Sequence, residues 1–220
     1  MRIRYKPWAR KELEESKFYR EHPEEIIGKW KNEYARPEQP LFVELGCGKG
    51  GFISEKASLH PENNYLAIDL VDPMLGLAKR KVEEVYSEAD REIDNIILTR
   101  FDIERILLIL NKQDLVEGIY INFCNPWPRG KHHKKRLTYT RQLEHYKQFL
   151  KPGGKIYFKT DDDNLFEESI HYFEDTEFKI EKITRDLQNE PDFWENIETE
   201  HEKMFSEQGI KIKALIAKAK

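Results

Sequence analysis

Residues 43–52 contain the residue types that hold adenosyl ligands in α/β proteins. Gly46, Gly48 and Gly50 follow an apolar run that predicts a buried strand, and a glycine-rich turn after a strand lets a ligand approach the backbone closely. Glu44 precedes the first glycine by two residues, where its carboxylate would repel a pyrophosphate and attract a cation. The pattern therefore favours S-adenosylmethionine, with its amino group and sulfonium, over a dinucleotide bound through G-x-G-x-x-G. The alternative is a tight turn without a ligand.

Two further acids follow the next two apolar runs. Asp69 ends the run at 65–68, about 20 residues beyond the glycines, the offset at which an acid meets ribose hydroxyls. Asp102 follows the run at 96–99 and is placed to accept hydrogens from an adenine amino group. Either acid alone is typical of a helix cap. Three acids at successive strand ends favour ligand contacts, because ligands lie outside the carboxyl ends of strands in open α/β sheets.

The elements that must position these acids alternate along the chain. Strands are predicted at 41–46, 64–70, 95–101, 118–123 and 154–160, and helices at 51–59, 73–88, 103–111, 137–150 and 163–173. This alternation predicts a parallel sheet with helices on both faces. Two late strand-like runs, 178–184 and 210–217, predict an antiparallel end. The expected fold class is α/β, a Rossmann-like seven-stranded methyltransferase sheet, mostly parallel with an antiparallel C-terminal strand.

Length and charge limit the possible organisation. We expect residues 1–40, which are charged and contain four prolines, to form a basic N-terminal arm with short helices at 11–20 and 24–34, and residues 41–220 to form a single domain. The net charge of −4 argues against a general polyanion binder, so positive charge is local. It gathers at the amino end (Arg2, Arg4, Lys6, Arg10, Lys11) and in the middle (Arg129, Lys131, Lys134, Lys135, Arg136).

The cysteines and the hydropathy favour a cytoplasmic protein. Only Cys47 and Cys124 are present, and no Cys/His spacing suits zinc, so we expect a reduced compartment and no metal. The start of the chain has no apolar signal core, and no run reaches the roughly 20 apolar residues of a membrane span. The protein is expected to be a monomer or a homodimer.

A rigid loop is predicted after the fourth strand, at 122–128. Pro126 and Pro128 fix the backbone and remove amide donors. Trp127 between them is a residue type that stacks on nucleic-acid bases, and the basic run 129–136 that follows would neutralise phosphates. A charge run by itself is typical of a solvated face, but its position directly after this loop favours RNA binding.

Together, these motifs resemble the bacterial tRNA (guanine-N7)-methyltransferases over essentially the whole chain. The rigid loop with its basic tail, the sequence Lys159-Thr160-Asp161 and the late Thr-Glu-x-Glu pattern are more specific than the glycine motif. The matching stretches are 4–9, 43–50, 122–128, 134–139, 151–154, 158–161 and 199–205.

The resemblance implies methyl transfer from S-adenosylmethionine to N7 of a guanine in the variable loop of tRNA. Residues implied to bind the cofactor are Glu44, Gly46, Gly48, Asp69, Asp102 and Asn125, and Asn125 would also contact the target guanine as the catalytic position. Residues implied to bind tRNA are Arg129, Asp161, Thr199, Glu200, His201 and Glu202. The structural alternatives are a capping box at 199–202 and a helix cap or, less in keeping with the pattern, a metal site at 161–163.

Three positions depart from the family pattern. Asn125 stands where Asp is usual, Arg129 where Lys is common, and Asp69 where Glu is common. Guanine N7 is an acceptor with a lone pair and no proton, so no general base is required and Asn125 is expected to position the substrate. The remaining alternatives are a small-molecule methyltransferase, which should have an apolar lid, and a non-catalytic tRNA-binding protein, favoured only by Asn125.

Overall fold

The computed structural model describes residues 5–220, which form two compact units. The first unit ends at Asp114 and the second is Leu115–Lys220. Arg2 and Arg4 of the basic amino end lie outside the described residues. The division between an arm at 1–40 and a domain at 41–220 stays a prediction.

The strands of the first unit form a parallel set. Its central strands are β2 (Leu41–Leu45), β3 (Asn64–Asp69) and β4 (Ile96–Arg100), with β3 paired to both neighbours. Most of their side chains are buried, as expected for parallel strands covered on both faces. A two-residue strand, β1 (Tyr19–Arg20), pairs in parallel with β4. The segment before residue 41 therefore contributes to the sheet.

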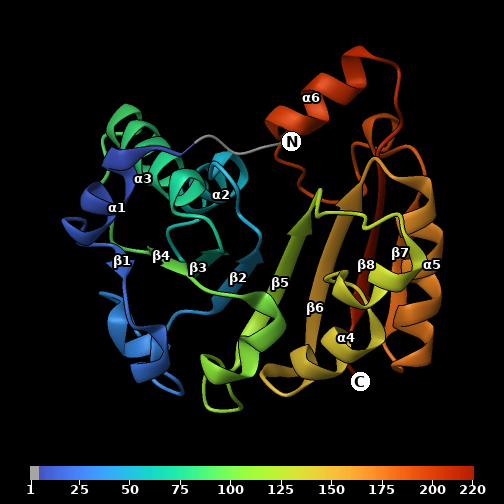
Figure 1. Ribbon diagram of the computed structural model, residues 1–220, viewed down its shortest axis with the longest axis horizontal. Helices are drawn as coiled ribbons and strands as arrows, with labels where there is room; N and C mark the ends of the chain where they lie inside the picture. The colour runs from blue at the N-terminus through green and yellow to red at the C-terminus, as the bar shows by residue number, and fades with distance from the viewer. Residues whose placement is uncertain (1–4) are drawn as a thin grey trace. The chain divides into compact units, whose positions relative to one another are not determined.

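The helices of the first unit begin where the sequence provides helix starts. Three α-helices are present in its described part: α1 (Pro7–Glu14), α2 (Gly51–Leu59) and α3 (Asp72–Glu88). Helices α1 and α3 begin with proline in the first turn, where its missing N–H costs no hydrogen bond. They pack side by side (Figure 1), and a Cβ on Gly76 would lie 2.6 Å from the Cβ of Ala9.

Four of the predicted helices differ in the structure, and the one expected at 137–150 is α-helical only over Thr140–Lys147. The helix expected at 11–20 is α1, because Pro7 starts it earlier and β1 follows. The segment at 24–34 forms two short 3-10 helices, η1 (Pro23–Glu25) and η2 (Trp30–Glu33). The segment at 103–111 forms the 3-10 helix η3 (Ile103–Leu108), which has a kink at Arg105.

The second unit supplies the antiparallel end of the fold. Strands β5 (Val116–Asn122) and β6 (Leu150–Thr160) are parallel, β8 (Lys213–Lys218) is antiparallel to β6, and β7 (Lys179–Thr184) is antiparallel to β8. Helices α4 (Thr140–Lys147) and α5 (Asp163–Asp175) pack on these strands (Figure 1).

The predicted fold class is confirmed, with two differences in detail. Residues 5–220 contain eight strands, one more than expected, because β1 joins β4. The second unit also contains α6 (Glu200–Glu207), in the polar segment for which no helix was predicted, and the 3-10 helices η4 (Gly130–Lys135) and η5 (Leu187–Asn189).

Candidate functional site

The glycine turn is left-handed at each of its three alternate glycines. Gly46, Gly48 and Gly50 have φ of 79°, 54° and 79°, a region that favours glycine. A Cβ on Gly50 would lie 2.8 Å from the Cβ of Ala78, so this glycine lets α2 begin against α3. A Cβ on Gly48 would meet no atom within 4 Å. The backbone at Gly48 is therefore open on the side where a ligand would approach.

Asp69 holds this turn through its carboxylate. It accepts hydrogen bonds from the backbone N–H of Gly48 at 2.9 Å and of Val71 at 3.0 Å. Burial raises the pKa of the Asp69 carboxyl, and the backbone hydrogen bonds partly offset that rise. Each carboxylate oxygen has two acceptor sites, so the group can hold the turn and still accept a ribose hydroxyl.

The other two acids lie at the same edge of the parallel strands. Glu44 lies near the end of β2, with 2% of the residue exposed. Asp102 follows β4 and caps η3, where it accepts from the N–H of Glu104 at 3.0 Å. The capping expected for Asp102 alone is thus present, and a carboxylate that caps through one oxygen keeps the other for a ligand. The three acids and the open glycine suit a cationic adenosyl group.

The loop after β5 is held in an uncommon backbone conformation. Phe123 and Trp127 have φ of 50° and 44°, values that non-glycine residues rarely adopt. The Oδ1 atom of Asn125 accepts a hydrogen bond from the N–H of Trp127 at 3.0 Å. Asn125 is exposed, and its amide NH₂ has no partner among residues 5–220. Its amide therefore stabilises the turn and offers two donors to a ligand.

The basic run divides into exposed residues and one buried arginine. Arg129 is exposed and makes no ion pair within the described part of the chain. Arg136, in contrast, is fully buried, so the prediction that it neutralises phosphates is wrong. Its guanidinium donates to Pro126 O at 2.8 Å, to Glu168 Oε2 at 2.7 Å and to Asn164 Oδ1 at 2.8 Å. Arg136 thereby fixes the rigid loop to α5.

Trp127 lies against the same basic run. The Nζ of Lys135 is 5.1 Å from the centre of its ring, and the ring of His132 is 5.8 Å away. Trp127 is half-buried. A base that stacks on it would therefore lie beside the cations of this run.

The acids after β6 have separate roles. Asp162 caps α5 by accepting from the N–H of Leu165 at 2.6 Å. Asp161 is half-buried, and no side chain among residues 5–220 donates to its carboxylate. Burial raises the pKa of the Asp161 carboxyl and the charge of Asp162 adds to that rise, whereas the charges of Lys213 and His201 lower it. Apart from a backbone hydrogen bond from its own N–H, the Asp161 carboxylate keeps acceptor sites to which no side chain among residues 5–220 donates, so it can accept from a ligand.

The segment at 199–202 forms one half of the expected capping box. Thr199 accepts from the N–H of Glu202 at 3.0 Å and so caps α6. The carboxylate of Glu202 is buried, and its Oε2 lies 2.6 Å from the Nζ of Lys159 in β6. Glu200 and His201 are exposed on the first turn of α6. Glu200 and His201 are therefore the parts of the segment most open to a ligand, whereas Glu202, which was also expected to bind tRNA, is buried against Lys159.

The structural roles of Lys159 and Arg136 were not predicted from the sequence, which named Lys159 only within a matching motif and Arg136 only as one of the basic run. The signal for Lys159 was a charge inside an apolar strand, which must be paired if the strand is buried. Its side chain is 1% exposed. Arg136 gave no such signal, because it ends a run of basic residues.

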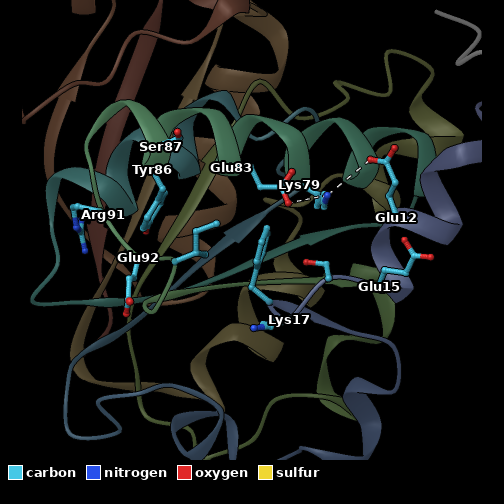
Figure 2. A pocket seen from close by; sticks show the side chains of 12 residues that line it. Glu12, Glu15, Lys17, Lys79, Glu83, Tyr86, Ser87, Arg91 and Glu92 are labelled. Carbon is cyan, nitrogen blue, oxygen red and sulfur yellow. Dashed lines mark ion pairs between the residues drawn. The ribbon is translucent and has the colours of Figure 1, made fainter.

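A hollow of about 600 Å³ lies in the first unit beside α1 and α3 (Figure 2). Its walls carry charges of both signs, and the Nζ of Lys79 lies 2.8 Å from Glu83 and 3.9 Å from Glu12. None of the predicted site residues lines it. This hollow is separate from the glycine turn.

Residues 5–220 contain neither a metal-binding cluster nor a membrane-spanning helix. No group of three or more His, Cys, Asp or Glu side chains is arranged to hold a metal ion there. No helix in that part of the chain has the length and apolar character needed to cross a membrane.

Comparison with known proteins identifies the family. Residues 38–215 match the model of a family described as "Putative methyltransferase". A tRNA (guanine-N(7)-)-methyltransferase of Clostridium beijerinckii is 57% identical over 99% of this chain and 98% of that protein. A protein of the same name from Clostridium perfringens (strain SM101 / Type A) is 54% identical over 99% of both.

Solved structures agree on the fold. The 16S rRNA methyltransferase KamB has a TM-score of 0.59 and 13% identity, over 82% of this chain and 88% of that chain. An antibiotic-related methyltransferase has a TM-score of 0.58 and 17% identity, over 82% and 87%. Full-length identity to the clostridial proteins goes further than this shared fold, and the chain belongs to the tRNA (guanine-N7-)-methyltransferase family.

Proposed function

We propose that this protein transfers a methyl group from S-adenosylmethionine to N7 of a guanine in tRNA. The observation that carries the proposal is the left-handed glycine turn between Glu44 and Asp69, in a chain 57% identical to a protein named for that reaction. The position within tRNA, a guanine of the variable loop, follows from the resemblance and belongs to the same proposal.

The first unit supplies the groups that would hold the cofactor. S-adenosylmethionine, when bound, provides an activated methyl group. Gly46 turns the backbone and Gly48 leaves room beside it, Asp69 would accept from the ribose hydroxyls, and Asp102 from the adenine amino group. The buried carboxylate of Glu44 would favour the cationic end of the molecule. Because these groups offer acceptors and no phosphate-binding cation, they fit an adenosyl sulfonium better than a pyrophosphate.

Asn125 would orient the target guanine. N7 needs no deprotonation because it has a lone pair and no proton. Asn125 already uses its Oδ1 to hold the turn, which leaves its NH₂ to donate to guanine O6 or to the cofactor. Its contribution is alignment, and a residue that aligns reacting groups lowers the barrier without exchanging a proton.

Asp161 and Arg129 would bind the tRNA through different groups, one at the base and one at a phosphate. The carboxylate of Asp161 can accept from the ring and amino N–H groups of guanine, a pattern that adenine does not present. Arg129 is exposed and can pair with a phosphate, while Thr199, Glu200 and His201 extend the contact surface. Base recognition and phosphate binding are thus assigned to different residues.

The test is methyl transfer from labelled S-adenosylmethionine to unmodified tRNA transcripts, with products mapped by cleavage at 7-methylguanine. We expect cleavage at one variable-loop guanine. Asn125→Ala should lower kcat/KM about 10- to 100-fold, the cost of one alignment contact. Asn32→Ala is the matched control, because Asn32 is an exposed asparagine of η2 outside the proposed site.

Each outcome of this test bears on a separate statement. If the wild-type protein transfers no label to any tRNA while it binds the cofactor, the proposed function is wrong and small molecules become the substrates to test. Full turnover in Asn125→Ala would remove the role of that residue and leave the reaction intact.

A further inference from the structure

Lys159 holds a buried ammonium group at the carboxyl end of β6. Its Nζ donates to Glu202 Oε2 at 2.6 Å, to Asn196 Oδ1 at 2.9 Å and to Ile197 O at 3.0 Å. An ammonium group has three hydrogens, so these three acceptors from one segment match its full donor capacity. The side chains of Lys159 and Glu202 are 1% and 2% exposed. Neither charge is available to bind a substrate directly.

The acceptors of Lys159 are themselves joined into a closed network. Asn196 donates from its Nδ2 to Glu202 Oε1 at 2.6 Å, and Thr199 accepts from the N–H of Glu202 at 3.0 Å. Trp194 donates from its indole to Asn196 Oδ1 at 3.1 Å. The segment 194–202 is therefore internally fixed, and Lys159 connects it to the strand.

The same strand end carries the proposed guanine acceptor. Lys159 is the next-to-last residue of β6, and Asp161 directly follows that strand. His201, in the first turn of α6, lies near enough for its charge to act on the Asp161 carboxyl. Figure 1 shows α6 beyond the ends of β5 and β6. Fixing α6 therefore also fixes what surrounds Asp161.

Phe123 connects the Asn125 loop, which is another part of the proposed tRNA site, to Lys159. Its N–H donates to the carbonyl of Lys159 at 2.9 Å, and its ring lies 5.8 Å from the Nζ. The ring of Phe123 also stacks on His201, with centres 6.0 Å apart and planes at 20°. Phe123 is two residues before Asn125. The Asn125 loop, the Asp161 strand end and the 199–202 segment thus meet around one buried cation.

We propose that Lys159 is a positioning residue for tRNA, and that with Glu202 it sets the place of Thr199 and His201 relative to Asp161. The inference rests on the proposed function. Stability alone does not explain the pair, because well-packed apolar residues usually replace a buried ion pair at no cost in stability. The apolar cluster of Leu187, Phe193 and Ile216, with Phe205 packed against it, already holds this segment to the unit. The charged groups fix the orientation of the segment, because hydrogen bonds are directional and apolar contacts are not.

The test replaces the pair with apolar residues, in the double variant Lys159→Met/Glu202→Leu. Because both charges are removed together, no unpaired charge is buried, and the melting temperature should stay within about 3 °C of the wild type. We expect the KM for tRNA to rise about tenfold or more, with kcat at saturating tRNA within about threefold. The Kd for S-adenosylmethionine should be unchanged. Amide hydrogen exchange should become faster in 196–202 and stay the same in β6.

Two further variants make the result interpretable. The control is Arg185→Gln/Glu167→Gln, which removes an exposed ion pair of the same unit, with side chains 59% and 53% exposed, and should leave every parameter at the wild-type value. If the double apolar variant does not fold, Glu202→Gln decides, because it keeps the shape and one acceptor. We then expect a rise of about threefold or more in the KM for tRNA with normal cofactor binding.

A wild-type KM for tRNA in the folded double variant, or in Glu202→Gln, would overturn the inference and leave the proposed function intact. A rise in KM that is matched by an equal rise in the Kd for the cofactor would also overturn it, because the effect would then be general. Absence of transfer by the wild-type protein would instead show that the proposed function is wrong.

Discussion

Replacing Arg136 with lysine should destabilise the protein while leaving its net charge unchanged. Three short hydrogen bonds of the buried guanidinium run in different directions, to Pro126 O, Glu168 Oε2 and Asn164 Oδ1, at 2.7 to 2.8 Å. Lysine places its donors on a single atom, so it can keep about one of the three contacts. The rest of the basic run is untouched.

The size of the effect follows from the two hydrogen bonds that lysine loses. Each contributes about 1 to 1.5 kcal/mol net, near the lower range for charged groups because the Glu168 side chain is 32% exposed. The loss is therefore about 2–3 kcal/mol, and at about 2–4 °C per kcal/mol for a chain of this length the melting temperature should fall by about 4–12 °C.

Arg129→Ala is the matched change in the same run. Arg129 is exposed and has no ion pair among residues 5–220, so the free energy of unfolding should change by no more than about 0.5 kcal/mol. If Arg129 pairs with one phosphate, the slope of log affinity for tRNA against log salt should become shallower by about 0.7–0.9. Arg136→Lys should keep the wild-type slope.

The assays are thermal unfolding without RNA and tRNA binding at a series of salt concentrations. A wild-type melting temperature in Arg136→Lys would refute the assignment of Arg136 as the clamp between the rigid loop and α5. A lowered melting temperature in Arg129→Ala would show that this arginine also has a structural role. An unchanged salt slope in Arg129→Ala would exclude its phosphate contact.

Three further predictions concern the glycine turn, the substrate acid and a thiol. Gly50→Ala should lower the free energy of unfolding by about 2–5 kcal/mol in urea titrations, because it adds left-handed strain and a 2.8 Å contact with Ala78. Gly48→Ala adds strain alone and should lower the free energy of unfolding by about 1–2 kcal/mol. Its main effect should be weaker cofactor binding, measured by calorimetry. Since burial raises the pKa of the Asp161 carboxyl and the ionised form is the acceptor, the KM for tRNA should rise as pH falls through that raised pKa, and Asp161→Asn should abolish this limb of the profile. Burial also holds the pKa of the Cys47 thiol well above its ordinary value, so this thiol should react slowly with an aromatic disulfide reagent until urea unfolds the chain.

Local patterns predicted the elements that hold the cofactor acids. Glu44 lies within an apolar run, Asp69 ends one and Asp102 follows one three residues later, and a run of this kind needs only its own residues to indicate a buried strand. The helix at 51–59 was predicted with its observed bounds, because a glycine turn starts it. The kinked η3 was predicted as a regular helix, since the conformation of Arg105 is not encoded in periodicity.

The roles within the basic run could not be predicted locally. Arg129 and Arg136 have the same side chain and similar neighbours in sequence. The difference between them is α5, which brings the acceptors of Glu168 and Asn164 to Arg136. These two residues lie 32 and 28 positions further along the chain. The sequence indicates how much positive charge is present, whereas the packing of α5 decides which cation turns inward.

The segment at 199–202 shows how a buried charge overrides a local motif. In a complete capping box the acid at the third position reaches back to the N–H of the capping residue. Thr199 makes its half of that motif, but the carboxylate of Glu202 contacts Lys159 and Asn196 instead. One carboxylate cannot occupy both places, and an unpaired ammonium in a buried strand costs far more than an unsatisfied backbone donor that water can reach. The requirement to neutralise Lys159 therefore decides the rotamer of Glu202, and the helix that presents His201 is oriented as a consequence.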